Sequence, residues 1–194
     1  MDEASEFLDG RGSVHRTLRR LAKRLAQLET AYAVCGGMAL FSQGFRRYTA
    51  DVDVLVTREE LKRIHEALDG LGYVPPFAGS KNLRDVEDGV RIEFIITGEY
   101  PGDGKPKPVA FPDPRDVAIE RDGIRFLDLA PLIELKLASG MTHPGRLKDL
   151  ADVQELIRIR KLDDAFAQKL NPYVRDKYAQ LLAGVRAMPE PHAG

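Results

Sequence analysis

The chain has 194 residues, 43% of them hydrophobic, which suffices for one domain with a substantial core or for a domain with a helical appendage. Its 29 Lys and Arg residues balance 30 Asp and Glu residues, and the formal net charge of −1 excludes an overall positive field that would attract nucleic acid. The single cysteine excludes an intrachain disulfide and favours a reducing, cytoplasmic setting. No apolar run approaches the roughly 20 residues that span a membrane, so we expect no membrane partner.

The first predicted element is a helix from Ser13 to about Thr30, and the polar, acidic residues 1–12 before it are expected to be disordered and not to be a signal peptide. Apolar residues recur in this helix at spacings of three and four: Val14, Leu18, Leu21, Leu25 and Leu28. The opposite face carries five cations: Arg16, Arg19, Arg20, Lys23 and Arg24. We interpret this face as solvated or, alternatively, as an anchor for RNA phosphates.

Strand-like and helical patterns alternate through the rest of the first half. Strands are predicted at 31–35, 49–56 and 90–97, and a hairpin at 117–126. Helices are predicted at 38–43, after Gly36-Gly37, and from Arg58 to about Leu71, after a capping box formed by Thr57 and Glu60. The connections are a loop-rich region at 75–89 and a long irregular loop at 98–114.

The second half is predicted to be helical, with segments at 131–139, 146–160, 163–170 and 171–183. The expected fold class is therefore α/β of the α+β kind: a mixed β-sheet core flanked by helices, followed by a helical C-terminal lobe. We place the core with its leading basic helix at 13–128 and the lobe at 129–186, and we expect disorder at 1–12 and 187–194.

Acidic residues on two of the predicted strands indicate a metal site. Asp51 and Asp53 share one face of a strand because side chains alternate, and paired carboxylates suit Mg²⁺. Glu93, on a later strand, is the candidate for a third ligand, although it could instead pair with Arg91 on the same face. The Gly36-Gly37 turn opens a helix, which suits a phosphate group, although such a pair is also common in plain tight turns.

These residues resemble a known family. Gly36-Gly37, then Arg47-x-Thr49-x-Asp51-x-Asp53, then an acidic residue on a later strand, is similar to the signature of the DNA polymerase β-like nucleotidyltransferase superfamily. The segments Leu132–Gly140 and Arg146–Val153 look like the AbiEii-type branch, the nucleotidyltransferase toxins of bacterial toxin–antitoxin systems. The resemblance covers about residues 30–157 and carries the expectation of a minimal nucleotidyltransferase core.

The resemblance implies roles for nine residues. Gly36, Gly37, Arg47 and Thr49 would bind the nucleotide and its phosphates, while Asp51, Asp53 and Glu93 would bind two Mg²⁺ ions. Lys136 would contact the triphosphate and Asp149 would place Lys136 or the substrate. The implied reaction transfers a nucleoside monophosphate from an NTP to an acceptor hydroxyl on an RNA, a protein or a small molecule such as an aminoglycoside, with release of pyrophosphate. The implied partners are NTP, that acceptor and an antitoxin.

Other interpretations stay open at this point. A catalytically inactive member would act as a binding module in a toxin–antitoxin complex, and a metal-dependent phosphohydrolase would use water as its acceptor. Lys136 and Asp149 could be ordinary surface charges on amphipathic helices, and Asp152 could be the ion-pair partner of Arg146 or Lys148.

Overall fold

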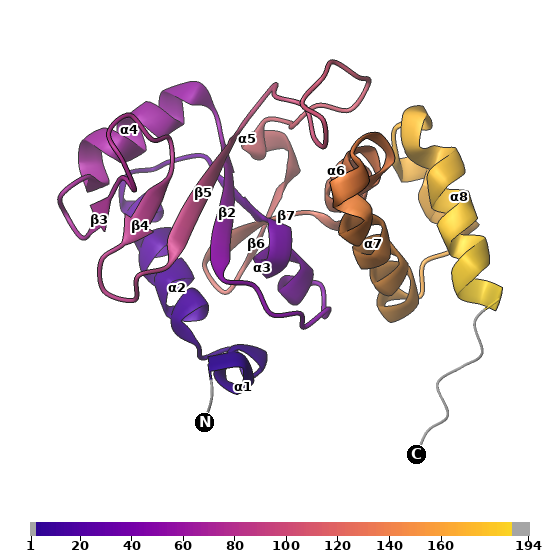
Figure 1. Cartoon of the computed structure of the whole chain (residues 1–194), viewed down its shortest axis with the longest axis horizontal. Helices are drawn as coiled ribbons and strands as arrows, with labels where there is room; N and C mark the ends of the chain where they lie inside the picture. The colour runs from indigo at the N-terminus through magenta and orange to yellow at the C-terminus, as the bar shows by residue number, and fades with distance from the viewer. Residues whose placement is uncertain (1–2, 188–194) are drawn as a thin grey trace. The chain divides into compact units, whose positions relative to one another are not determined.

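The structure, a computed structural model, describes residues 3–187, and these fall into two compact units. The first unit runs to Ser42 and resumes over Arg46–Glu99 and Phe111–Asp128. The second takes Gln43–Phe45, Tyr100–Ala110 and the chain from Leu129 onward. The sequence prediction places a boundary after residue 128 and assigns the two short segments of the second unit to the core. Figure 1 labels most of the helices and strands of both units.

The first unit contains a seven-stranded mixed sheet, in the order β3-β4-β5-β2-β1-β7-β6. The strands are β1 Ala33–Cys35, β2 Asp51–Val56, β3 Tyr73–Val74, β4 Leu83–Asp85, β5 Arg91–Ile96, β6 Ala118–Arg121 and β7 Ile124–Leu127. β2 pairs in parallel with β5 and antiparallel with β1, while β1 pairs in parallel with β7. This mixed sheet with flanking helices confirms the expected α/β fold class.

Five helices belong to the first unit: α1 Glu3–Leu8, α2 Ser13–Gln27, α3 Gly36–Ser42, α4 Arg58–Leu68 and α5 Pro114–Val117. The predicted cap of α4 is present, since the Glu60 amide donates a 3.2 Å hydrogen bond to the Thr57 hydroxyl. The apolar faces of α2 and α4 share one core with alternate residues of β2 and β5: Val52, Val54, Val56, Ile92, Phe94 and Ile96. The other alternating residues of these strands therefore lie on the opposite face of the sheet.

The expectation that residues 1–12 are disordered is wrong for the helix α1. Phe7 is completely buried, with its ring 4.8 Å from that of His15 and 5.5 Å from that of Phe41. The Glu3 carboxylate accepts a 2.7 Å hydrogen bond from the Ser13 amide at the start of α2. The buried ring of Phe7 and the Glu3 carboxylate hold this segment in place. Neither contact produces a periodic pattern of apolar residues in the sequence.

The predicted loop at 75–89 also contains structure that the sequence pattern missed. β3 lies just before this region and β4 lies within it, and the two strands form one end of the sheet. Both strands are very short, and β4 ends on Asp85, a buried carboxylate. A buried charge breaks the apolar alternation by which a strand is recognised.

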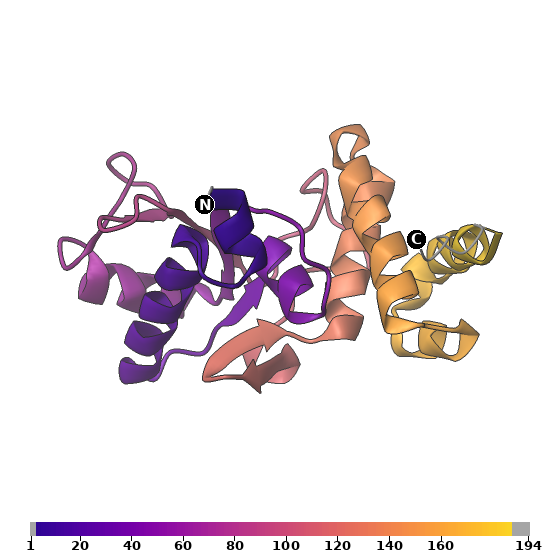
Figure 2. The ribbon, with the colours of Figure 1, turned by 90° about the horizontal axis from the view of Figure 1, so that it is seen from below.

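The second unit contains three helices, α6 Leu129–Thr142, α7 Leu147–Arg160 and α8 Pro172–Ala187, and two short 3₁₀ helices, Pro144–Arg146 and Asp164–Lys169. α6 and α7 run side by side (Figure 2), and Gly140 of α6 packs against the Leu150 side chain of α7. The segment predicted as a helix at 163–170 is the second 3₁₀ helix. The predicted disorder at 187–194 lies outside the described residues apart from Ala187, which ends α8. None of the described helices has the length and apolar character needed to cross a membrane.

Candidate active site

Three carboxylates of the first unit lie on the sheet face opposite α2 and α4. β2 and β5 run in parallel, with Asp53 beside Glu93 and Asp51 beside Arg91. Across the other edge of β2, Asp53 is the register partner of Cys35, the last residue of β1. The three acidic side chains are neither buried nor fully exposed. Asp51, Asp53 and Glu93 are therefore brought to one accessible patch of two adjacent strands, as the sequence predicts.

The glycine pair fits closely against this patch. Gly36 follows β1 directly with a φ of +58°, and a Cβ atom added there would lie 1.8 Å from Oδ2 of Asp53. A Cβ atom at Gly37 would lie 2.6 Å from Cβ of Thr49. Both positions therefore exclude side chains, and the reason is contact with two residues of the predicted signature.

Thr49 and Arg91 connect to the carboxylates directly. The Thr49 hydroxyl donates a 2.7 Å hydrogen bond to Oδ1 of Asp51. Nη2 of Arg91 lies 2.8 Å from Oε1 of Glu93 and 3.6 Å from Oδ2 of Asp51. The pairing of Glu93 with Arg91, one of the two interpretations left open by the sequence, is thus present. Arg91 supplies positive charge between two of the three carboxylates.

The donor chemistry of this patch fits Mg²⁺, because carboxylate and hydroxyl oxygens are its preferred protein ligands. Within residues 3–187, however, no three His, Cys, Asp or Glu side chains converge as a ready-made metal site. The Arg91 guanidinium lies between Asp51 and Glu93, and its side chain is 54% exposed. A cation at these carboxylates would thus compete with the Arg91 guanidinium for the same oxygens.

Arg47 lies with Thr49 in the irregular segment between α3 and β2, and its side chain is half-buried. The roles of these two residues in nucleotide binding stay predictions. The same holds for the metal-binding roles of Asp51, Asp53 and Glu93.

The other two predicted site residues belong to a buried ionic cluster in the second unit. Nζ of Lys136, on α6, lies 2.9 Å from Oδ1 of Asp149 and 2.8 Å from Oδ2 of Asp152, both on α7. All three residues are buried. The interpretation of Lys136 and Asp149 as ordinary surface charges is therefore wrong, and Lys136 is a partner of Asp152.

Asp149 is the centre of this cluster. Its Oδ2 accepts a 2.7 Å hydrogen bond from the Ser139 hydroxyl and lies 3.0 Å from Nε of Arg146. Burial acts to raise the pKa of Asp149, but the charge and hydrogen bond of Lys136, with the Ser139 hydrogen bond, outweigh burial and hold the pKa below its usual value. The carboxylate is therefore ionised at neutral pH.

Asp152 and Ser139 are members of this cluster that sequence reasoning did not assign. The spacing of Asp149 and Asp152 places both on one face of α7, and that of Lys136 and Ser139 places both on one face of α6. These spacings are the signal that could have identified the cluster.

Comparison with known families finds a match over most of the chain. The sequence model of a family described as uncharacterised nucleotidyltransferase matches residues 5–182. The chain belongs to this nucleotidyltransferase family. The match includes both units and every residue of the two clusters. No curated protein matches the chain.

Solved structures similar to this nucleotidyltransferase have low sequence identity. JHP933 from Helicobacter pylori is 15% identical, with a TM-score of 0.50 over 96% of this chain and 91% of that one. TM1012 from Thermotoga maritima, a candidate nucleotidyltransferase, is 20% identical, with a TM-score of 0.44 over 75% and 89% of the two chains. A candidate nucleotidyltransferase from H. pylori is 16% identical, with a TM-score of 0.48 over 89% and 92%. The likeness to JHP933 shows a shared fold.

Proposed function

We propose that this nucleotidyltransferase moves a nucleoside monophosphate from an NTP to an acceptor hydroxyl, with Mg²⁺ and with release of pyrophosphate. The observation that carries the proposal is the joint packing of two signature elements: Gly36 and Gly37 lie against Asp53 and Thr49, and Thr49 donates to Asp51. A glycine turn with no side chains leaves backbone groups accessible beside carboxylates, which is the arrangement that phosphate and metal together require.

Each residue has a proposed task. Asp51 and Asp53 would hold two Mg²⁺ ions, and Glu93 would complete the ion on the acceptor side and take up the acceptor's proton. Bound Mg²⁺ supplies positive charge that stabilises the charge developing on the transferred phosphoryl group. Gly36, Gly37, Arg47 and Thr49 would position the nucleotide. For Lys136 to contact a triphosphate, as the resemblance implies, its Nζ would have to leave Asp149 or Asp152, which hold it in the buried cluster of the second unit.

We place the protein in the AbiEii-type branch, as a toxin-related enzyme of the cytoplasm with an antitoxin as its partner. Support comes from the pairing of Lys136 with Asp149, because these are the residues by which the sequence resembles that branch. A single buried cysteine suits a reducing compartment. The acceptor class is left to experiment among an RNA end, a protein hydroxyl and a small molecule such as an aminoglycoside.

The test is a transfer assay with each of the four NTPs labelled at the α-phosphate, in Mg²⁺, with total RNA, the protein itself or an aminoglycoside as acceptor. We expect one acceptor to become labelled and pyrophosphate to be released. Asp51→Asn and Asp53→Asn each remove the negative charge but keep the size of the side chain. Each substitution should reduce transfer at least about 100-fold. Glu66→Gln, on the exposed face of α4, is the matched control and should leave transfer unchanged.

A second function is favoured by one specific observation. Arg91 already neutralises two of the three carboxylates, which is what a member without catalysis, acting as a binding module, would retain. The two functions separate in one experiment, because a binding module would show no label transfer with any acceptor. If NTP and Mg²⁺ together also fail to raise the melting temperature, the enzyme proposal is overturned.

A further inference from the structure

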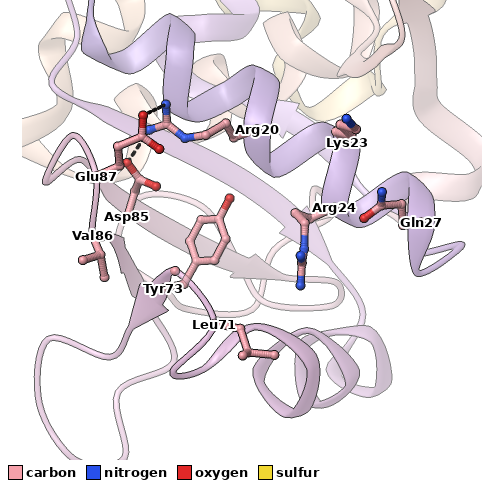
Figure 3. Close-up of a pocket in the computed structure, with 10 residues that line it drawn as sticks. Arg20, Lys23, Arg24, Gln27, Leu71, Tyr73, Asp85, Val86 and Glu87 are labelled. Atoms are coloured by element: carbon pink, nitrogen blue, oxygen red, sulfur yellow. Dashed lines mark hydrogen bonds and ion pairs between the residues drawn. The ribbon is translucent and has the colours of Figure 1, made fainter.

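A cavity of about 490 Å³ lies in the first unit between α2 and the connections around β3 and β4. Figure 3 shows Arg24 extending from α2 toward Leu71, beside the ring of Tyr73. The cavity has no residue in common with the carboxylate patch, which lies on the sheet face opposite α2. We call it the α2 groove, and the proposed nucleotidyl transfer gives it no role.

One wall of the α2 groove is held in place by its own ion pairs. Nη2 of Arg20 lies 2.6 Å from Oδ2 of Asp85, and Nη1 lies 3.3 Å from Oε1 of Glu87. The Thr17 hydroxyl donates to Asp85 at 3.1 Å, and the Asp88 amide donates to Asp85 at 2.8 Å. This wall is therefore preorganised, and the charge of Arg20 is already matched.

The remaining cations of the groove are unmatched. Within residues 3–187, neither Lys23 nor Arg24 has a side-chain hydrogen bond or an ion pair. Both extend from the solvent side of α2, and Lys23 is exposed while Arg24 is half-buried. Two unmatched positive charges beside a cavity attract an anionic group.

Exposed aliphatic side chains border the same cavity. Leu71 is 64% exposed and Val86 61% exposed, and Figure 3 shows them on opposite sides of Tyr73. Across the described residues, seven large apolar side chains are exposed, and these two lie beside the same cavity. Two exposed aliphatic side chains beside one cavity give a ligand apolar surface to pack on.

The chemistry of the groove distinguishes between a polypeptide and a nucleic acid. Arg16 and Arg20 are paired with Asp88, so two of the five cations on the face that could anchor RNA phosphates are neutralised. Asp85 and Glu87 on the wall repel any anion beside them, so a ligand must place its negative charges at Lys23 and Arg24 and not along the whole groove. A polypeptide with separate carboxylates can do so, whereas a continuous phosphate backbone cannot. The one aromatic side chain of the lining, Tyr73, is only 4% exposed, so no ring is available for base stacking.

We propose that the α2 groove binds an acidic polypeptide segment of a partner protein. Carboxylates of the segment pair with Lys23 and Arg24, and an aliphatic side chain between them packs on Leu71 and Val86. The carboxylates of the peptide would neutralise the unmatched charges of Lys23 and Arg24. Its aliphatic side chain would cover the exposed side chains of Leu71 and Val86.

The test begins with a displayed library of random 16-residue peptides selected against the immobilised full-length protein. We expect enriched sequences to combine Asp or Glu with Leu, Ile, Val or Met. The most enriched peptide, labelled with fluorescein, is then measured by anisotropy. Charge reversal in Lys23→Glu with Arg24→Glu should weaken its binding at least about tenfold, and Leu71→Ser with Val86→Ser should do the same.

The matched control is Arg58→Glu with Lys62→Glu on the exposed face of α4, which makes the same charge change away from the groove. This variant should bind the peptide within about twofold of the natural chain. Melting temperatures of all variants establish that they fold. The proposal is overturned if no acidic–aliphatic sequence is enriched, or if binding is insensitive to both groove variants. Tight binding of a 12-nucleotide single-stranded RNA that requires Lys23 and Arg24 would also overturn it, in favour of a nucleic-acid site.

Discussion

At the scale of single residues, the contact between Gly36 and Asp53 explains why the turn after β1 needs glycine. Many glycines of the chain have a positive φ, but most have open space where a Cβ would stand. Gly36 combines a positive φ with an acidic side chain against its Cα. The free-energy cost of the positive φ and that of the contact with Asp53 can therefore be separated by substituting different glycines.

We predict that Gly36→Ala destabilises the protein more than Gly70→Ala does. Gly70 has a φ of +75° and nothing within 4 Å of a built Cβ, so its substitution should cost only the left-handed backbone penalty of about 1–2 kcal/mol. Gly36→Ala adds the displacement of the Asp53 carboxylate. Urea unfolding of both variants measures the difference, and equal losses would show that the contact with Asp53 has no energetic weight.

Arg91 is predicted to compete with divalent cations. Replacing it in Arg91→Gln removes the positive charge between Asp51 and Glu93 and should strengthen Mn²⁺ binding by about three- to tenfold, as measured by electron paramagnetic resonance. Arg63→Gln is the control, because Arg63 pairs with Glu60 at 2.8 Å on α4, away from the carboxylate patch. Unchanged or weaker Mn²⁺ binding in Arg91→Gln would contradict the competition.

At the scale of elements, α1 shows that one anchor residue orders a short terminal helix. Phe7→Ala should destabilise the protein by about 3 kcal/mol, because Phe7 is completely buried against His15 and Phe41. Leu8→Ala, at a neighbouring position that is 42% exposed, should have little effect. Thermal and urea unfolding measure both. A loss below about 1 kcal/mol in Phe7→Ala would mean that α1 opens independently of the core.

The pairing of α6 with α7 should depend on pH through Asp149. Its pKa is lowered in the folded chain, so its stabilising contribution is present above the unfolded-state pKa of about 3.9 and is lost as pH falls through the folded-state value. Asp149→Asn should cost about 3 kcal/mol near pH 7, because Lys136 loses a buried partner. Its unfolding midpoint should also fall less than that of the natural chain below pH 4.

Urea unfolding at several pH values measures this dependence. Glu155→Gln, an exposed position on the same helix α7, is the control and should follow the natural chain at each pH. Parallel pH curves for Asp149→Asn and the natural chain would show that the titration of Asp149 does not contribute.

The sequence predicts the elements that carry a regular apolar pattern. β2, β5 and α2 were predictable because their buried residues repeat at the spacing of a strand or a helix. β4 was not, because its Asp85 is buried by pairing with Arg20, which lies 65 positions earlier. The burial of Lys136 was within reach of the sequence, since its helix is apolar on nearly every side and such a helix is usually buried.

At the scale of the whole molecule, neither of the two units is one continuous stretch of the sequence. The second unit receives Tyr100–Ala110 before the chain returns to the first at Phe111. In this segment Val109 is 2% exposed, and the Asn171 side chain donates a 3.2 Å hydrogen bond to the Pro108 carbonyl. The placement of Asp51, Asp53 and Glu93 on one face of two strands could be predicted from the alternation of side chains, but the division of the chain between the two units could not, because it depends on contacts between distant segments.

A chain that ends at Asp128 should therefore leave Tyr100–Ala110 without its packing partners. Limited thermolysin digestion measures this, because Val109 is 2% exposed in the full chain and the bond before it should become a rapid cleavage site. Phe77, which is 69% exposed in a connection that stays within the first unit, is the internal control and should be cut at an unchanged rate. Equal protection of the bond before Val109 in both chains would mean that the segment holds its structure alone.

The contact between Gly36 and Asp53 also restricts the order in which substitutions at positions 36 and 53 can occur as related sequences diverge. A side chain at position 36 becomes acceptable only after the carboxylate at position 53 has been removed, since the two cannot share the space. If position 36 changes first, the new side chain overlaps the Asp53 carboxylate and strains the protein until position 53 also changes. A related chain with a larger residue at the position of Gly36 should therefore have lost its acid at the position of Asp53, and with it one of the metal ligands proposed above.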